Sequence, residues 1–121
     1  MLPIVTPEEM RVIDATALEP AHVLIARAGS AVARSAVHLL GGTYGRTVNI
    51  IAGKGNNGAD GRVAAERLRV SGVRVRIFDV DECPPTLPPA DLVIDAAFGT
   101  GFRGVWKAPD VGDTPVLAVD I

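Results

Sequence analysis

The sequence predicts an α/β fold, a Rossmann-like three-layer αβα domain with a mostly parallel sheet. Residues 47–52 are rich in β-branched side chains and residues 73–80 alternate apolar side chains with arginines, so both are predicted as strands. Residues 92–94 and 115–119 are predicted as further strands, and their apolar side chains are typical of strands buried on both faces. Residues 59–70 have the composition of a helix between the first two strands. Strands separated by crossovers pair in parallel, so this order favours a sheet with helices on both faces.

Two helices are predicted before the first strand. Thr6 and Pro7, followed by two glutamates, begin one helix over residues 6–18. Pro20 begins a second helix that ends at Leu40, before two glycines. The apolar and small residues of the second helix recur at helical spacing: Val23, Leu24, Ala28, Ala31, Val32, Ser35 and Leu39.

The later connections are short. Residues 81–89 are proline-rich and residues 98–104 are glycine-rich, so both are predicted as loops. About a dozen residues remain before the fourth strand, which is near the minimum for a parallel crossover and leaves no room for a full helix. The last strand ends at Ile121. We therefore expect residues 1–121 to be one domain that is incomplete at its C-terminus, and to be poorly stable and nearly inactive alone.

Composition limits the function classes. The chain has 121 residues and a net charge of −2, which argues against nucleic acid or an anionic membrane as a partner. No apolar run reaches the ~18 residues of a membrane span. A lone Cys83 forms no internal disulfide and fits a reducing compartment, so we expect a cytoplasmic protein. The arginines between residues 62 and 76 are mixed with acids and are interpreted as a solvated face.

A glycine-rich loop is the first candidate site. Residues 53–61 read Gly-Lys-Gly-Asn-Asn-Gly-Ala-Asp-Gly, between a strand and a helix. Backbone amides at such a helix N-terminus bind phosphate groups. Gly53, Gly55 and Gly58 satisfy G-x-G-x-x-G, and Asp79 lies 21 residues after Gly58 at the end of the next strand. This spacing matches a dinucleotide-binding fingerprint, although a tight structural turn remains the alternative.

Polar residues at the strand ends add to this loop. Asn56, Asn57 and Asp60 form an oxygen-rich set that could hold a hydrated cation or ligand hydroxyls, or simply make a turn. Asp95 and Asp120 each follow an apolar strand, where an acid can also cap a helix. Parallel strands bring their carboxyl ends to one edge, so a shared site is favoured.

The loop at residues 99–104 is a second candidate for ligand contact. Its glycines allow backbone amides to approach a ligand, and Arg103 could meet a phosphate. Phe102 could stack on a ring or plug the loop onto the core.

Three segments carry a resemblance to a known family. Residues 53–61, residues 95–104 and the final Val-Asp-Ile resemble the ordered motifs of the YjeF N-terminal domain, the module of NAD(P)H-hydrate epimerase. The resemblance implies an isomerase of nicotinamide cofactor repair, which interconverts the R and S epimers at C6 of hydrated NADH and NADPH (NADHX and NADPHX). It also implies a K⁺ ion held by Asn57 and Asp95. It implies these substrate contacts: Asn56, Asn57, Gly58, Ala59, Asp60, Gly99, Thr100, Gly101, Phe102, Arg103, Gly104, Val105 and Asp120.

The same resemblance implies partners and a catalytic group. A fused or separate NAD(P)H-hydrate dehydratase and a homodimer are expected. C6 of the hydrate is a hemiaminal carbon, so loss of its hydroxyl gives an iminium to which water can return on either face. Asp120 is the expected acid–base group on this route, and ring opening is another route.

The sequence departs from the family at three places. Ala59 replaces a frequent glycine, residues 105–115 are shorter than the family's helix, and the Pro-Ser-Gly serine, a further K⁺ ligand, is absent. The alternatives to an epimerase are a non-catalytic nucleotide-binding or scaffold module and half of an NAD-dependent oxidoreductase. Retention of Asp60, Asp95 and Asp120 favours the epimerase over the scaffold.

Overall fold

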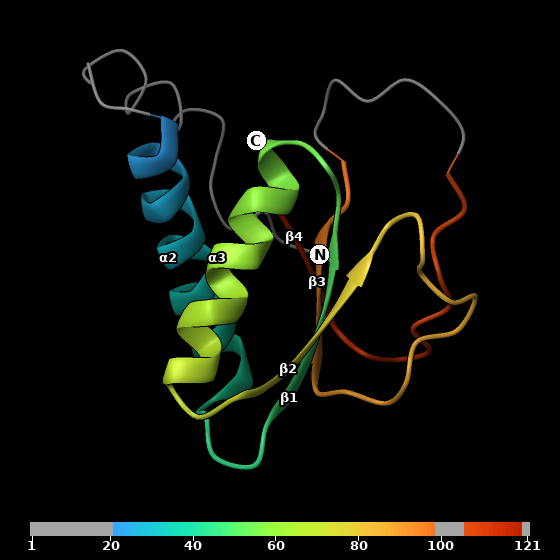
Figure 1. Cartoon of the computed structure of the whole chain (residues 1–121). Coiled ribbons are helices and arrows are strands. Elements are labelled where there is room, and N and C mark those ends of the chain that lie inside the picture. Colours follow the sequence, from blue (N-terminus) through green and yellow to red (C-terminus); the bar gives the residue numbers. More distant parts are fainter. Residues whose placement is uncertain (1–20, 99–105, 120–121) are drawn as a thin grey trace.

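The computed structural model describes residues 21–98 and 106–119, and these form a parallel sheet with two helices on one face (Figure 1). The strand order is β2-β1-β3-β4, and every pairing is parallel. These findings confirm the α/β class and the parallel sheet. The elements are α2 Ala21–Leu40, β1 Thr47–Ala52, α3 Asn56–Val70, β2 Arg74–Asp79, β3 Leu92–Ala96 and β4 Val116–Ala118.

The two helices run side by side and bury the main core between themselves and the sheet (Figure 1). A side chain at Gly29 of α2 would overlap Val63 of α3, so glycine allows the two helices to approach closely. Gly61 has the same relation to Ala96 of β3. Fully or almost fully buried members of this core are Val32, Ala36, Val48, Ile50, Ala64, Leu68, Leu92 and Ile94.

By length and composition alone, α2 could cross a membrane, since His22–Leu40 has a mean hydropathy of 1.3. The same composition suits a helix that covers a sheet. Ala28, Val32 and Ala36 of α2 are buried in this way, although only a third of the apolar stretch is buried overall. The helix therefore fits the role of a core helix in this fold.

The second face of the sheet carries no helix among the described residues. Residues 80–91 and 106–115 cover it instead, joined by a parallel bridge between Thr86 and Asp110. Leu87 is buried against Ile51 and Val93, and the Phe98 and Trp106 rings pack edge to face with centroids 5.3 Å apart. The prediction that residues 106–115 hold no full helix is confirmed, and the third layer at this face consists of two loops.

A buried amide fastens one of these loops to the sheet. Asn49 in β1 is fully buried; its Nδ2 donates to the Pro88 carbonyl at 2.8 Å, and its Oδ1 accepts from Arg76 at 3.3 Å. Arg76 also donates to the Pro89 carbonyl at 3.1 Å. Proline carbonyls in a loop without regular pairing need such donors, so this network satisfies polar groups that would otherwise be buried unpaired.

Several predicted boundaries differ from the structure. α3 begins three residues earlier than predicted, and β3 continues through Asp95 to Ala96 instead of ending at Ile94. The predicted helix over residues 6–18 lies outside the described residues. Cys83 lies in the second-face cluster, and burial raises the pKa of its thiol, as expected of an unreactive loop cysteine.

Candidate functional site

The candidate site lies at the carboxyl edge of the sheet, where α3 begins. Asn56, Asn57 and Gly58 form the first turn of α3, so the sequence prediction that they belong to a loop was wrong. The amide of Ala59 donates to the Gly55 carbonyl at 3.1 Å, which starts the helical hydrogen bonding. No side chain caps this end, because the N-cap residue is Gly55. Amides of the first turn are thus directed towards the sheet edge, as a phosphate site requires.

Close packing of backbone explains two of the glycines. A Cβ atom added to Gly58 would overlap the carbonyl of Gly53, and one added to Gly53 would overlap the carbonyl of Ala97. The Gly53 amide donates to the Ala96 carbonyl at 2.9 Å, which holds the loop against the end of β3. By contrast, a Cβ atom at Gly55 would have no neighbour within 4 Å among the described residues. These residues leave the space beside Gly55 open, and a ligand can approach the helix N-terminus there.

Asn57 and Asp95 both bond to Val119. The Asn57 amide nitrogen donates to the Val119 carbonyl at 3.2 Å, and the Val119 amide donates to the Asp95 carbonyl at 2.9 Å. Asn57 lies 62 positions before Val119 in the sequence, and Asp95 lies 24 positions before it. The fold thus brings both residues to Val119, just beyond β4. By alternation along β3, the Asp95 side chain belongs to the face opposite α3, so a ligand shared with Asn57 has to lie over the edge of the sheet.

The Asp95 carboxylate already has one bond. Its Oδ1 accepts from the Ala97 amide at 3.1 Å. The Asn57 amide oxygen and the other Asp95 oxygen accept no hydrogen bond from the described residues, so a ligand can bind these atoms. No group of three or more acidic, histidine or cysteine residues within the described chain could hold a metal ion. The oxygens of Asn57, Asp95 and nearby carbonyls are instead the weak, hard donor set that suits an alkali cation.

Asp60 is a buried acid with no partner among the described residues. It is 1% exposed, and neither carboxylate oxygen accepts a hydrogen bond from the residues that the structure describes. Burial raises the pKa of Asp60 from 3.8 to about 7, because the charged form loses its hydration. The resemblance placed Asp60 among the substrate contacts; in the structure this carboxyl is buried, one turn after Asn57 along α3.

Charged pairs line the end of β2. Arg62 of α3 donates through Nη1 to the Gly53 carbonyl at 2.8 Å and through Nη2 to Asp79 at 3.2 Å. Lys54 pairs with Asp81 at 2.5 Å, and a hydrogen bond to Asp81 raises the pKa of Lys54. The sequence interpretation treated Arg62 as part of a solvated face and so missed its contact with the glycine-rich loop. The signal available in the sequence was an arginine on the helix after the loop, facing an acid at the end of the next strand.

The remaining predicted site residues lie outside the described parts of the chain. These are residues 99–105 and Asp120, so their roles stay predictions. The described part of the predicted site, Asn56 to Asp60 and Asp95, does lie at one edge of the sheet.

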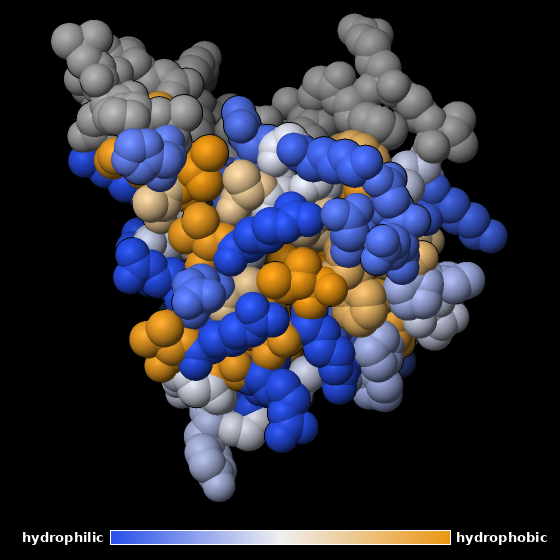
Figure 2. Space-filling model, in the orientation of Figure 1, coloured by the Kyte–Doolittle hydropathy of each residue, from blue (hydrophilic) through white to orange (hydrophobic). Residues whose placement is uncertain are grey.

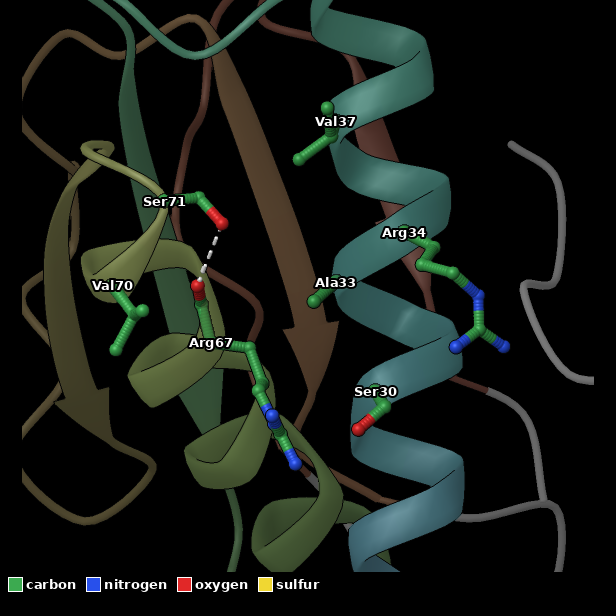
Figure 3. Close-up of a pocket in the computed structure, with 7 residues that line it drawn as sticks. All are labelled: Ser30, Ala33, Arg34, Val37, Arg67, Val70 and Ser71. Atoms are coloured by element: carbon green, nitrogen blue, oxygen red, sulfur yellow. Dashed lines mark hydrogen bonds between the residues drawn. The ribbon is translucent and has the colours of Figure 1, made fainter.

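A groove of about 470 Å³ lies elsewhere, between the C-terminal halves of α2 and α3 (Figure 3). It is about 20 Å along α3 from the helix N-terminus, given a rise of about 1.5 Å per residue. It contains none of the predicted site residues and is therefore separate from the site at the sheet edge. Its lining residues are Ser30, Ala33, Arg34, Val37, Arg67, Val70 and Ser71.

A family model agrees with this arrangement. The model described as the YjeF-related protein N-terminus matches residues 21–87, which is more than half of the chain and includes the glycine-rich loop. The chain belongs to this family. The YjeF-related assignment was predicted from the three motifs, and the match confirms it.

Relatives of this YjeF-related chain carry two kinds of name. The NAD(P)H-hydrate epimerase of Rhodobacter capsulatus is 31% identical over 168 residues, covering 100% of this chain and 76% of the relative. The NAD(P)H-hydrate epimerase of Limosilactobacillus reuteri is 31% identical, covering 98% and 72%. The bifunctional NAD(P)H-hydrate repair enzyme Nnr of Moorella thermoacetica is 32% identical, covering 84% of this chain but 26% of the relative.

The first alignment also bears on the short connections. It spans 168 positions, whereas this chain has 121 residues, so the relative carries additional residues within the aligned region. A solved structure supports the fold: that of yeast ynu0, YNL200c, has a TM-score of 0.57 and 24% identity, covering 89% of this chain and 61% of the yeast chain. The YjeF-related fold is thus present in a shorter aligned region.

Proposed function

We propose that this protein is an NAD(P)H-hydrate epimerase that interconverts the R and S epimers of NADHX and NADPHX. The observation that carries the proposal is the convergence of Asn57 and Asp95 on Val119, beside the uncapped N-terminus of α3. This edge offers amides for a pyrophosphate and oxygens for a polar ring substituent. Relatives named as NAD(P)H-hydrate epimerases, at about 30% identity and with most of their length covered, support the same activity.

The chemistry assigned to the protein is proton transfer at C6 of the hydrate. Asp120, the residue after Val119, donates a proton to the C6 hydroxyl, which departs as water while the N1 lone pair forms an iminium. Water then adds to the opposite face, and the carboxylate recovers the proton. Amides of the first turn of α3 hold the pyrophosphate and orient the ring, and the negative carboxylate stabilises the iminium.

A potassium ion fits the proposed site. The donors are the Asn57 amide oxygen and the Asp95 carboxylate, which approach from the two faces of the sheet edge. A bound K⁺ would supply a fixed positive charge beside the anionic groups of site and substrate. The names of the bifunctional relatives also support a dehydratase as fused or separate partner.

The activity is tested by adding purified R-NADHX to the protein and following the S epimer by chromatography. We expect epimerisation above the uncatalysed background, and a decrease of roughly 10²–10⁴-fold for Asp120→Asn. Asp113→Asn removes the same charge from an exposed turn and serves as the matched control. Binding of the hydrate with no turnover by the wild type would instead support a non-catalytic nucleotide-binding module.

The potassium site is tested by thermal unfolding in KCl and in choline chloride at equal ionic strength. At a K⁺ concentration ten times Kd, the folded state gains about 1.4 kcal/mol. That gain raises Tm by several degrees. For each of the variants Asn57→Ala and Asp95→Ala, we expect the Tm in KCl to equal the Tm in choline chloride. The potassium assignment is wrong if wild-type Tm does not differ between the salts.

A further inference from the structure

The strand order determines in which direction a bound dinucleotide lies along the edge of the sheet. α3 begins beside the end of β1, with β2 on one side and β3 and β4 on the other (Figure 1). Asn57 and Asp95 lie on the β3 and β4 side, where the proposed function places the nicotinamide ring. With the pyrophosphate at the N-terminus of α3, the adenosine half extends towards β2.

The residue at the end of β2 is suited to contact a ribose. Asp79 pairs with Ala52 at the last register position of β1 and β2, and its side chain belongs to the face that carries α3. Its carboxylate is bonded to Arg62 at 3.2 Å and to the amide of Asp81 at 3.0 Å. The other charged groups nearby, Lys54 and Asp81, already form a pair.

The Arg62–Asp79 pair is accessible and anchored at one end. The side chains are 42% and 36% exposed, so the pair contributes little to stability and opens at small cost. Arg62 is also fixed by its bond to the Gly53 carbonyl, which keeps the guanidinium beside the glycine-rich loop when Asp79 is engaged elsewhere. Figure 2 shows one face of the molecule, on which hydrophilic side chains are interspersed with apolar patches.

We propose that the Arg62–Asp79 pair determines how the protein accepts the 2′ position of the adenosine ribose. This inference rests on the proposed function for its substrates. Asp79 accepts hydrogen bonds from the 2′- and 3′-hydroxyls of NADHX, as an acid at this position does in dinucleotide folds. Arg62 forms a charge-assisted bond with the 2′-phosphate of NADPHX, which the Asp79 carboxylate by itself would repel. The two charges together allow both hydrates to bind.

The experiment measures KM for NADHX and NADPHX with two variants. Arg62→Ala should raise KM for NADPHX about tenfold and leave KM for NADHX within about threefold. Asp79→Asn should do the opposite, raising KM for NADHX and lowering KM for NADPHX. A merely structural role of the pair would change both constants in the same direction, so the ratio of the two KM values is the decisive quantity.

Two further variants serve as controls. Arg62→Lys keeps the charge and should restore part of the NADPHX affinity. Arg69→Ala removes another exposed arginine of α3, one that contacts the Val75 carbonyl, and should leave the ratio unchanged.

A binding measurement separates this inference from the proposed function. Calorimetry with AMP and with adenosine 2′,5′-bisphosphate should show the same opposite shifts in Arg62→Ala and Asp79→Asn, whether or not the protein epimerises either hydrate. If the wild type turns over neither hydrate but the fragment preferences shift, the function is wrong and the role of the pair stands. An unchanged fragment preference in both variants, or failure of both fragments to bind the wild type, overturns the inference.

Discussion

Gly58→Ala should destabilise the folded protein by about 3 kcal/mol, at the upper end of the cost of overpacking. The added methyl would overlap the backbone carbonyl of Gly53. Backbone cannot rotate away as a flexible side chain can, so either the first turn of α3 or the end of β1 has to move. That movement also displaces the amides that the proposed phosphate site requires.

Gly55→Ala is the matched control for this prediction. It adds the same methyl three residues earlier, where no atom of the described residues lies within 4 Å and the backbone dihedrals suit any residue. Urea unfolding of both variants gives the stability difference, and titration with ADP-ribose gives the effect on binding. Equal stabilities for the two variants would show that the loop does not pack as closely as the structure indicates.

The strands were predictable because their residue types show which segments are buried. The first strand was predicted with the observed bounds, Thr47–Ala52, and the order of elements was correct throughout the described residues. Apolar β-branched stretches between turn residues leave few alternatives to a buried parallel strand. The spatial order β2-β1-β3-β4 was not part of the sequence prediction; it places β2 and β3 on opposite sides of β1, and the candidate site lies where the order changes side.

Helix boundaries and faces were less predictable. Asn57 and Gly58 have low intrinsic helix propensity, so the predicted start of α3 was late; the bond from Asn57 to Val119 and the close contact at Gly58 stabilise that first turn instead. In α2, Leu39 was assigned to the apolar face but is 50% exposed, while Leu40 is buried. The packing of α2 against α3 determines which side of α2 is buried, and the sequence of α2 alone does not show where α3 lies.

The site was predictable in position but not in detail. Strand ends indicated correctly that Asn57 and Asp95 lie at one edge, because topology alone brings these ends together. The burial of Asp60 could not be predicted, since a polar residue next to a glycine-rich loop is usually exposed. Its environment depends on Gly29 of α2, which allows α2 to contact the Asp60 backbone.

The buried Asp60 should make stability fall as pH rises. Its pKa is 3.8 in the unfolded chain and about 7 in the folded protein. Well below pH 3.8 both states carry the proton, and the folded state has its full stability. Between the two pKa values the unfolded state ionises while the folded state keeps its proton, so the free energy of unfolding decreases. Above pH 7 the loss is complete, at about 4 kcal/mol for a shift of about three pH units.

Asp60→Asn should recover most of this loss, because the amide has nearly the same shape and cannot ionise. We expect the variant to exceed the wild type in free energy of unfolding by a margin that grows by about 2.5 kcal/mol between pH 5 and pH 8. Urea unfolding at fixed ionic strength across this range measures the margin directly. Asp113→Asn changes net charge equally at an exposed position and controls for that change.

The same variant distinguishes a structural carboxyl from a functional one. If the role of Asp60 is only structural, the Asp60→Asn variant should be more stable than the wild type at pH 8 and retain epimerisation. If the substrate depends on this carboxyl, the gain in stability should accompany a loss of kcat, as is common where an active site stores destabilising groups. A margin that stays constant from pH 5 to pH 8 would contradict this prediction. It would mean that the Asp60 carboxylate has a partner in the folded protein, so that its burial does not raise its pKa, although neither oxygen has a partner among the described residues.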